Sequence, residues 1–441
     1  MHDKTYDFIA IGLGPFNLGL ACLTEPLDNL DGLFLERGAG FDWHPGMLLE
    51  DSTLQTPFLA DLVTLADPTS RFSFLNYLKA QGKLYSFYIR EDFFLLRNEY
   101  NQYCQWAVSQ LSSIRFQHDV QRIDYDTEQD CYVIRCTDTR RGEPVSYRAR
   151  KLVLGTGTTP YLPNCCRTHA ERVVHSGQYL ENKAELQTKK SITLLGSGQS
   201  AAEIYKDLLQ DIDRYGYTLN WITRSPRFFP LEYGKLTLEM TSPEYIDYFH
   251  ALPEATRDRL MRTQKGLYKG INLELINAIY DLLYTKRLNG ELDTHLLTNA
   301  QLEDCRFDPT ANEFDLTLLH TEQEQRYRHH TQALVLATGY RYEEPAFLAP
   351  IAAQIRRDNV GRFAVDRHYS IDRSCSRIFV QNAELHTHGL AAPDLGMACY
   401  RNACIIRELT GIEHYPIEQR IAFQQFGAPD ETVFHPQRMT A

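Results

Sequence analysis

Apolar and polar positions near the start of the chain follow the order expected for a strand, a glycine turn and a helix. An apolar run at residues 8–11 breaks into a glycine-containing turn at 12–17, and an Ala/Leu-rich stretch at 18–23 follows. A second apolar run, residues 33–35, ends in the acidic Glu36. Short apolar runs bounded by turn residues are typical of buried strands, so this order predicts a Rossmann-like βαβ unit.

The same pattern recurs in the second half of the chain. Residues 191–195 form an apolar run that leads into a glycine turn at 196–203. A stretch with helical character at 204–209 and a further strand at 219–223 come next. Because the two starts lie so far apart in the sequence, they predict two dinucleotide-binding units and not a tandem repeat.

Two further apolar runs, residues 152–154 and 333–336, also end in glycine turns and bracket the second unit. They are natural places for the chain to leave and re-enter the first domain, so we predict an α/β fold in which the second domain is inserted in the first. The first domain is then residues 1–185 and 327–425, the second 186–326, and a polar, loosely held tail 428–441. Within the second domain, residues 226–288 predict a small, mostly helical region that caps a substrate.

The first glycine turn has a complete dinucleotide-binding context. Gly12 allows a tight turn, Gly14 lets the backbone approach a pyrophosphate, and Pro15 opens a helix whose positive end receives the phosphates. Glu36 ends the second strand, where a carboxylate accepts hydrogen bonds from ribose hydroxyls. Asn17 replaces the third glycine of the fingerprint, so close packing of helix on strand is not guaranteed. We predict that this turn binds an adenine dinucleotide, and the alternative is an ordinary turn between strand and helix.

The second glycine turn differs at the position that recognises the ribose. Gly196 and Gly198 repeat the turn, and Gln199 and Ser200 open its helix. The following strand ends near Arg224 and not at an acid. A carboxylate there would repel a 2′-phosphate, whereas an arginine pairs with it. The alternative is a surface arginine, but two sites of different polarity favour two nucleotides, FAD in the first domain and NADPH in the second.

Composition narrows the class of protein. The 441 residues are 43% hydrophobic, and the net charge of −11 argues against nucleic acid as a partner. The sequence has no apolar run approaching the ~18 residues of a membrane helix, and residues 1–7 have no signal-peptide pattern. Ten cysteines without a C-x-x-C pair and fifteen histidines without a ligand spacing predict reduced thiols and no metal site. We therefore expect a cytoplasmic enzyme, forming a homo-oligomer (dimer or tetramer).

A series of short motifs runs along the chain: GLGPFNL at 12–18, WHPGM at 43–47, LQTPFL at 54–59, DLV at 61–63, DPTS at 67–70, FLNYL at 74–78, GSGQSA at 196–201, ATGY at 337–340 and THGL at 387–390. In combination they resemble the microbial N-hydroxylating flavin monooxygenases of siderophore synthesis, which include lysine N6- and ornithine N5-hydroxylases. The resemblance covers about residues 5–410.

This resemblance implies a reaction and further site residues. NADPH reduces FAD, O2 adds to the reduced flavin, and the flavin C4a-hydroperoxide passes its distal oxygen to an amine. The chemistry is the cofactor's, so the protein's task is to exclude water, and no catalytic triad is expected. The implied residues are Gln55 beside the flavin, Trp43, His44 and Met47 in a loop that contacts FAD, and Thr338 and Gly339 of the ATGY motif at a cofactor. The alternatives are a glutamine at the edge of the core for Gln55 and simple packing for Trp43 and Met47.

The chain departs from the amino-acid hydroxylases where they bind the substrate's carboxylate. Their lysine between Phe-Leu and Asp-Leu-Val is Ala60 here, and a buried carboxylate without a cation would cost several kcal/mol, an order of magnitude only. By the same resemblance, Leu238, Leu267 and Gly396 replace two asparagines and a serine. Apolar or small residues thus stand where polar groups would hold an amino-acid head.

A substrate with an amine and no carboxylate fits these changes, namely an aliphatic diamine such as putrescine or cadaverine. Its second ammonium needs an anion or an aromatic face. Asp394 is the first candidate for that anion and Glu384 the second, and a solvated carboxylate or helix cap is the alternative for each.

Other activities remain open at this stage. A lysine or ornithine N-monooxygenase could bind its carboxylate through other cations, such as Arg71 or Lys269. A thiol–disulfide or quinone reductase would use the same two-nucleotide fold, but the missing C-x-x-C disfavours it. An NADPH-dependent flavin reductase without hydroxylation and a non-catalytic nucleotide-binding protein are more remote alternatives.

Overall fold

The first glycine turn joins β1 (Thr5–Ile11) to α1 (Pro15–Thr24), in a computed structural model that describes residues 4–429. Alternate residues of β1 enter two different cores. Phe8 and Ala10 pack on the face that α1 covers, and Ile9 and Ile11 pack on the opposite face. Because side chains alternate along a strand, both faces of a strand this apolar must be covered.

The first sheet combines a parallel part with an antiparallel part. Its order is β5-β2-β1-β8-β7-β6, with β19 beside β8, and β1 is parallel to both β2 and β8. Strands β6, β7 and β8 form an antiparallel meander. The remaining bounds are β2 (Gly32–Leu35), β5 (Ile114–Arg115), β6 (His118–Asp126), β7 (Cys131–Asp138), β8 (Glu143–Leu154) and β19 (Ile378–Val380).

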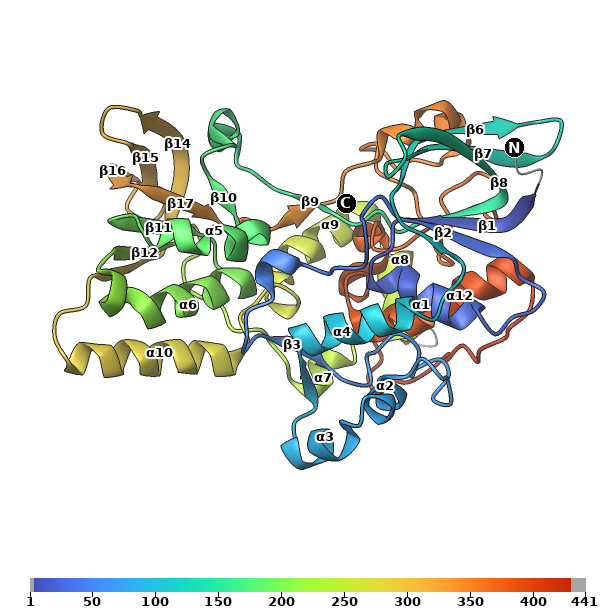
Figure 1. Cartoon of the computed structure of the whole chain (residues 1–441), viewed down its shortest axis with the longest axis horizontal. Helices are drawn as coiled ribbons and strands as arrows, with labels where there is room; N and C mark the ends of the chain where they lie inside the picture. Colours follow the sequence, from blue (N-terminus) through green and yellow to red (C-terminus); the bar gives the residue numbers. More distant parts are fainter. Residues whose placement is uncertain (1–3, 430–441) are drawn as a thin grey trace, which may run out of the picture.

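The second sheet is parallel throughout and has the order β10-β17-β11-β12-β13. Figure 1 shows it beside the first sheet, with the antiparallel sheet β14-β15-β16 next to it. The bounds are β10 (Val174–His175), β11 (Ser191–Leu195), β12 (Thr218–Ile222), β13 (Thr294–Leu297), β14 (Ala300–Asp308), β15 (Glu313–His320), β16 (Gln325–Thr331) and β17 (Ala333–Leu336).

Two strands, β10 and β17, belong to the second sheet and not to the domain in which the sequence predicts them. The boundaries at 185/186 and 326/327 assign β10 and β17 to the first domain, but β17 pairs with β11 from Ile192↔Ala333 onward and β10 pairs with β17. The chain passes between the sheets at β9 (Thr159–Pro160) and β18 (Tyr340–Arg341), which pair with each other. The second unit therefore begins after β9 and ends before β18.

Helices cover both units (Figure 1). The packed helices of the first core include α1, α4 and α12, and α6 and α10 pack together beside the second sheet. The bounds are α2 (Phe74–Ala80), α3 (Leu84–Arg90), α4 (Arg97–Val108), α5 (Tyr179–Leu186), α6 (Gln199–Tyr215), α7 (Lys235–Leu238), α8 (Pro243–Ala251), α9 (Glu254–Thr263), α10 (Leu273–Leu288), α11 (Leu385–His388) and α12 (Ala398–Thr410). No helix within residues 4–429 is long and apolar enough to cross a membrane.

The predicted helical region 226–288 is helical but divided. Helices α8 and α9 pack against α11, which belongs to the C-terminal part of the first unit, whereas α10 packs against α6 of the second. The region thus spans both units and does not form a cap of its own. Most of the predicted tail 428–441 lies outside the described residues.

Short helices of the 3-10 type and a small two-stranded sheet complete the structure. Strands β3 (Thr53–Pro57) and β4 (Phe94–Leu96) pair in antiparallel fashion. The 3-10 helices are η1 (Pro45–Met47), η2 (Asn164–His169), η3 (Ser176–Gln178), η4 (Lys265–Leu267), η5 (Ala346–Gln354), η6 (Gly389–Ala391) and η7 (Leu395–Met397).

Candidate functional site

The first glycine turn leaves an open space in front of α1. Gly12 has φ +86°, and a Cβ at this residue would lie 2.4 Å from the carbonyl oxygen of Gly155, so a side chain is excluded there. A Cβ at Gly14 would have no heavy atom within 4 Å. The backbone is therefore exposed at the positive end of a ten-residue helix, which is where a pyrophosphate binds in this type of turn.

Asn17 packs closely despite replacing the third glycine. Its Nδ2 donates to the Gly12 carbonyl at 2.6 Å, and its Oδ1 accepts from Gln381 Nε2 at 2.7 Å. A Cβ on Gly155, after β8, would lie 2.4 Å from that Nδ2. The expectation that close packing is not guaranteed here is thus corrected, because the glycine that makes room lies on the neighbouring strand.

Glu36 lies beside the first turn, as its position after β2 predicts. Its Oε2 accepts from the Leu13 N–H at 2.8 Å, and its Oε1 accepts from the Gly38 N–H at 2.7 Å. The carboxylate is held by backbone groups in the half-buried space next to Gly14. This is the place and the chemistry that a ribose diol requires.

Sequence reasoning missed the strand β19 and the residue that follows it. Gln381 N–H donates to the Leu154 carbonyl at 2.8 Å, which places Gln381 at the same sheet edge as the first turn. Its buried Oε1 has no hydrogen-bond partner within the described part of the chain. The apolar run Ile378–Val380, parallel to β8, was the signal that could have identified it. An acceptor without a donor next to the turn fits a hydroxyl-bearing group such as the ribityl chain of FAD.

The second glycine turn is built in the same way on β11 and α6. Gly196 has φ +147°, and a Cβ there would lie 2.3 Å from the Ala337 carbonyl oxygen. Gly198 precedes Gln199 and Ser200 at the start of α6, and the Lys269 carbonyl lies 3.8 Å from the position of a Gly198 Cβ. The segment containing Lys269 thus lies directly over this turn.

Arg224 and the ATGY motif both lie at the carboxyl edge of the second sheet. Ser225, next to the exposed Arg224, has its Oγ 3.2 Å from the Oγ of Ser197 in the glycine turn. Thr338 donates through its hydroxyl to the Tyr161 carbonyl, and the Gly339 carbonyl accepts from the Tyr161 N–H at 2.9 Å. Thr338 and Gly339 therefore lie at the link between the two units.

Gln55 lies where the two units meet. It is part of β3, and its Nε2 donates to Gln199 Oε1 at 3.4 Å. Gln199 Nε2 donates in turn to Glu203 at 2.9 Å, and Arg97 of the first unit donates to both Glu203 oxygens at 3.0 and 2.8 Å. Arg97 also donates to the Met47 carbonyl at 2.9 Å. One network therefore joins Gln55 and the loop at Met47 to the second nucleotide turn.

The three residues of the WHPGM motif that were predicted to contact FAD have different surroundings. Trp43 packs on Tyr100, with ring centroids 5.4 Å apart, and Met47 is buried in the core of the second unit. His44 has φ +54° and lines a cleft of about 500 Å³ at the link between the units, together with His175, Gln178 and Tyr340. Packing thus accounts for the positions of Trp43 and Met47.

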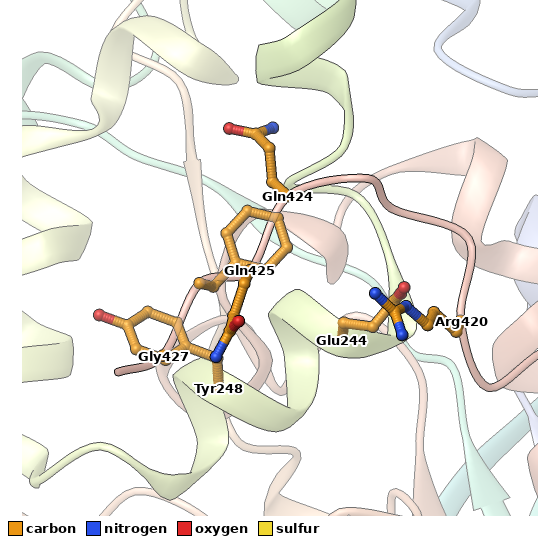
Figure 2. Close-up of a pocket in the computed structure, with 7 residues that line it drawn as sticks. Glu244, Tyr248, Arg420, Gln424, Gln425 and Gly427 are labelled. Atoms are coloured by element: carbon orange, nitrogen blue, oxygen red, sulfur yellow. The ribbon is translucent and has the colours of Figure 1, made fainter. Parts of the chain in front are cut away.

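A second hollow, of about 320 Å³, lies against α8 (Figure 2). The residues that line it come from α8 and from the C-terminal segment, and those labelled in Figure 2 are Glu244, Tyr248, Arg420, Gln424, Gln425 and Gly427. Glu244 accepts from the backbone of Ile421 and Ala422 at 2.7 and 2.8 Å.

No group of three or more His, Cys, Asp or Glu side chains within 4–429 is arranged to hold a metal ion.

The paired strands β3 and β4 connect the segment of Ala60 to Tyr233. Ala60 is buried, and its N–H donates to the Pro57 carbonyl at 2.9 Å. Pro57 pairs with Phe94 of β4, whose ring centroid lies 6.3 Å from that of Tyr233. The charge of Asp394 acts on Tyr233, because burial and this carboxylate together raise the pKa of the tyrosine. The segment of Ala60 is thus linked through Pro57 and Phe94 to Tyr233, the tyrosine on which the Asp394 charge acts.

Asp394 is half-buried and its carboxylate is only partly engaged. Its Oδ1 accepts from the Gly396 N–H at 2.6 Å, as the cap of η7. Burial raises the pKa of the Asp394 carboxyl, and the Gly396 hydrogen bond and the Arg401 charge lower it less. Glu384, the second candidate, is fully buried and ion-paired with Arg401, so its charge is already compensated.

Leu238 and Leu267 are both partly buried but differ in their neighbours. Leu238 ends α7, and the next residue, Glu239, accepts from the Phe423 and Gln424 N–H groups at 3.0 Å each. Leu267 packs in a hydrophobic cluster that contains Leu390 of the THGL motif. The motif and the segment at Leu267 are thus brought together by apolar packing.

The two cations considered as alternative carboxylate ligands lie elsewhere. Arg71 is exposed, stacks over Phe72 and pairs with Glu25 at 3.4 Å. Lys269 lies at the second glycine turn. Neither side chain contacts Ala60 within residues 4–429, and Arg71 is already paired with Glu25.

Two nucleotide-binding turns on parallel strands, joined by a glutamine network, define the class of two-dinucleotide oxidoreductases. The model of the L-lysine 6-monooxygenase/L-ornithine 5-monooxygenase family matches residues 4–342. The chain belongs to this family.

Individual relatives extend over nearly the whole chain. A putrescine N-hydroxylase of Shewanella oneidensis is 56% identical over 425 residues, which are 96% of this chain and 85% of the relative. The FAD-bound cadaverine monooxygenase DfoA of Erwinia amylovora has a TM-score of 0.96 and 60% identity, covering 97% of this chain and all of that one. The ornithine N-hydroxylase KtzI of Kutzneria, with reduced FAD, NADP⁺ and L-ornithine, has a TM-score of 0.85 at 28% identity, covering 92% and 99%.

Proposed function

We propose that the chain is an FAD- and NADPH-dependent monooxygenase that hydroxylates one primary amine of an aliphatic diamine, putrescine or cadaverine, for hydroxamate siderophore synthesis. Ala60 is the observation that carries the proposal. Ala60 is buried and apolar. By the resemblance described above, the amino-acid hydroxylases have a lysine at this position. The names of the relatives, a putrescine N-hydroxylase and a cadaverine monooxygenase, support the same substrate class.

The surroundings of Ala60 favour a substrate without a carboxylate. Burying a carboxylate without a cationic partner costs several kcal/mol of free energy. Arg71 is engaged with Glu25 at the surface and Lys269 lies against Gly198, so the cations named as substitutes have other neighbours. This supports a diamine over lysine or ornithine.

Asp394 and Tyr233 supply what the second ammonium of a diamine needs. The Gly396 N–H donates to Oδ1 of the carboxylate and not to Oδ2. Burial and the charge of Asp394 raise the pKa of Tyr233. An ammonium between an anion and an aromatic face gains both a charge-assisted hydrogen bond and a cation–π contact. We therefore assign the distal ammonium to this pair.

The residues around both turns fit the two cofactors. Gly12, Gly14, Glu36 and Gln381 would hold FAD, through an open backbone, a ribose acceptor and a buried amide. When bound, FAD supplies electron transfer from NADPH and the activation of O2. Gln55 would direct its amide toward the flavin from the junction of the units.

The chain's own task is to keep the reacting amine neutral and dry. A free primary amine has a pKa near ~10.4 and is mostly protonated at neutral pH. The apolar side chains around Ala60, including the buried Leu62 and Val63, would disfavour the charged form at one end of the diamine. Asp394 would favour it at the other, so the two ends are differentiated.

We further propose that the chain forms a homo-oligomer through α10. Leu273, Tyr280, Tyr284 and Leu288 are 54–71% exposed and form one stripe along this helix. If two copies pair α10 in antiparallel fashion with Leu273 opposite Leu288, Glu274 of each lies opposite Arg287 of the other. A stripe that complements itself in shape and charge fits a two-fold interface.

The compartment and domain limits are part of the same proposal. All ten cysteines are free thiols, and eight of them are buried, which supports a reducing cytoplasm. The FAD unit comprises the seven-stranded sheet and its helices, and the NADPH unit comprises the chain between β9 and β18.

A substrate panel tests the proposed function. The purified protein with FAD and NADPH is given putrescine, cadaverine, lysine or ornithine, and O2 uptake and hydroxylamine formation are measured together. We expect coupled turnover with at least one diamine. Coupled turnover of lysine or ornithine, with none of either diamine, would overturn the proposal.

A further inference from the structure

Three cations near the second glycine turn form no ion pair within the described part of the chain. Arg224, Lys265 and Lys269 form no ion pair with another residue in the 4–429 range. The protein carries a net charge of −11, so carboxylates outnumber cations in the chain as a whole. Three unpaired cations whose charges act on one another indicate a site for an anionic ligand.

Backbone geometry holds the three residues around the turn. The Lys269 carbonyl approaches Gly198 to 3.8 Å from its Cβ position, and the Asn272 N–H donates to Gln199 Oε1 at 2.9 Å. Lys265 lies one helical turn before Lys269, and its carbonyl accepts the Lys269 N–H at 2.8 Å. From the other side, Ser225 contacts Ser197 at 3.2 Å, which fixes Arg224 next to the turn.

The lysines and the arginine lie close enough to repel one another. Desolvation lowers the pKa of the Lys269 ammonium, and the charges of Lys265 and Arg224 lower it further. A like-charge cluster of this kind is unfavourable in the absence of a ligand. An entering dianion would reverse that sign and be attracted by all three.

We propose that Lys269, assisted by Lys265, binds the 2′-phosphate of NADPH together with Arg224 and so determines the preference for NADPH over NADH. The inference rests on the NADPH dependence proposed above. A guanidinium recognises phosphate through paired N–H groups, and the ammonium groups add compact charges. Only the 2′-phosphate distinguishes NADPH from NADH, so its ligands are the specificity residues.

The experiment measures binding of two nucleotides to the FAD-loaded enzyme by calorimetry. The first, 2′,5′-ADP, carries the 2′-phosphate, and the second, ADP, lacks it. We expect Lys269→Ala to weaken 2′,5′-ADP about tenfold, the loss of one charge-assisted bond, and to leave ADP unchanged. Lys265→Ala should have a smaller effect and Lys269→Arg should restore binding.

Lys190→Ala is the matched control. Lys190 is an exposed lysine of the same unit, next to the start of β11 and therefore at the opposite end of the strand from the turn. If Lys269→Ala behaves like Lys190→Ala, or weakens both nucleotides equally, the inference is overturned. Because neither probe contains a nicotinamide or an aliphatic amine, the result does not depend on whether the enzyme hydroxylates a diamine.

The coenzyme ratio gives a second readout. The kcat/KM of NADPH relative to NADH for flavin reduction should fall about tenfold in Lys269→Ala, by the same loss of one phosphate contact. An unchanged ratio would contradict the inference.

Discussion

Arg97 and Glu203 form a bidentate ion pair that connects the two nucleotide-binding units, with N–O distances of 2.8 and 3.0 Å. The Arg97 and Glu203 side chains are only 12% and 4% exposed. Glu203 also accepts from Gln199, which contacts Gln55, so the pair supports the junction at which both nucleotides would meet.

Breaking this pair should reduce both stability and coupling. Glu203→Gln leaves the Arg97 cation without its counter-ion, and we expect the free energy of unfolding in urea to fall by about 3 kcal/mol. The fraction of NADPH oxidised that yields hydroxylamine should also fall, because Gln199 and Gln55 lose their support. Glu185→Gln, which removes the exposed partner of Lys189, is the control and should change stability by less than about 0.5 kcal/mol. Equal effects of the two substitutions would contradict the prediction.

Ala60→Lys should move the substrate preference toward amino acids. The new ammonium would attract the carboxylate of lysine or ornithine and repel the second ammonium of a diamine. We expect kcat/KM for the diamine to fall more than tenfold and some turnover of an amino acid to appear. Ala60→Met, similar in length and uncharged, separates the charge from the bulk, and thermal melting of both variants checks the fold. A diamine preference that survives Ala60→Lys would count against the assignment.

Asp394→Asn should weaken diamine binding and leave monoamines unaffected. Removing the charge removes the partner of the distal ammonium, so KM for putrescine or cadaverine should rise about tenfold or more. Butylamine has no second ammonium, and its KM should not change between the two proteins. A parallel rise for both substrates would indicate a general distortion of the site.

The acid limb of the pH profile should also depend on Asp394. Burial raises the pKa of its carboxyl above the ordinary value, so protonation begins at a higher pH than in a solvated aspartate. Because the ionised form binds the ammonium, kcat/KM for a diamine should fall as the pH drops through this raised pKa. The same raised value means that ionised Asp394 destabilises the ligand-free fold above its pKa and that protonation relieves this cost. The acid limb should disappear in Asp394→Asn and persist if another group is responsible.

Gly14→Ala and Gly12→Ala should separate cofactor binding from folding. A Cβ on Gly14 meets no protein atom within 4 Å and the residue has φ −83°, so the apoprotein should unfold at an unchanged midpoint. The methyl group would project into the space in front of α1, and FAD retention, followed by absorbance after gel filtration, should fall. Gly12→Ala has positive φ and a backbone clash, so it should destabilise the apoprotein itself. Full FAD retention by Gly14→Ala would exclude the turn as the pyrophosphate site.

Charges introduced into the α10 stripe should separate the subunits. Tyr280→Glu and Tyr284→Glu place carboxylates in the centre of the proposed two-fold contact, and light scattering should report a smaller particle. Tyr215→Glu, on an exposed tyrosine outside the stripe, is the control. An unchanged mass in the stripe variants would move the interface elsewhere.

The glycine turns could be predicted from sequence because a strand, a turn and a helix are specified by neighbouring residues. Gly12, Gly196 and Glu36 lie where these local patterns indicate. Sheet membership could not be predicted in the same way, since Ala333–Leu336 is an equally apolar strand in either sheet and its pairing with β11 is a long-range choice.

The missed residues depend on partners that are distant in the chain. Arg97 and Glu203 read separately as ordinary helix residues, and their importance follows from the approach of two units. The sequence offered Lys269 only as a carboxylate ligand for the alternative activity, a lysine or ornithine N-monooxygenase. Its carbonyl instead lies over Gly198, and only the packing of residues 265–272 on α6 reveals this.

The paired connections β9 and β18 restrict how the two units can move. They cross side by side, with Thr159 opposite Arg341 and Pro160 opposite Tyr340. Two adjoining connections act as a hinge: the units can rotate about the axis along the link, but rotation about a perpendicular axis would break the β9–β18 pairing. The Arg97–Glu203 ion pair joins the two units at a second place, away from this hinge. A rotation that separates the units there would first have to break the ion pair.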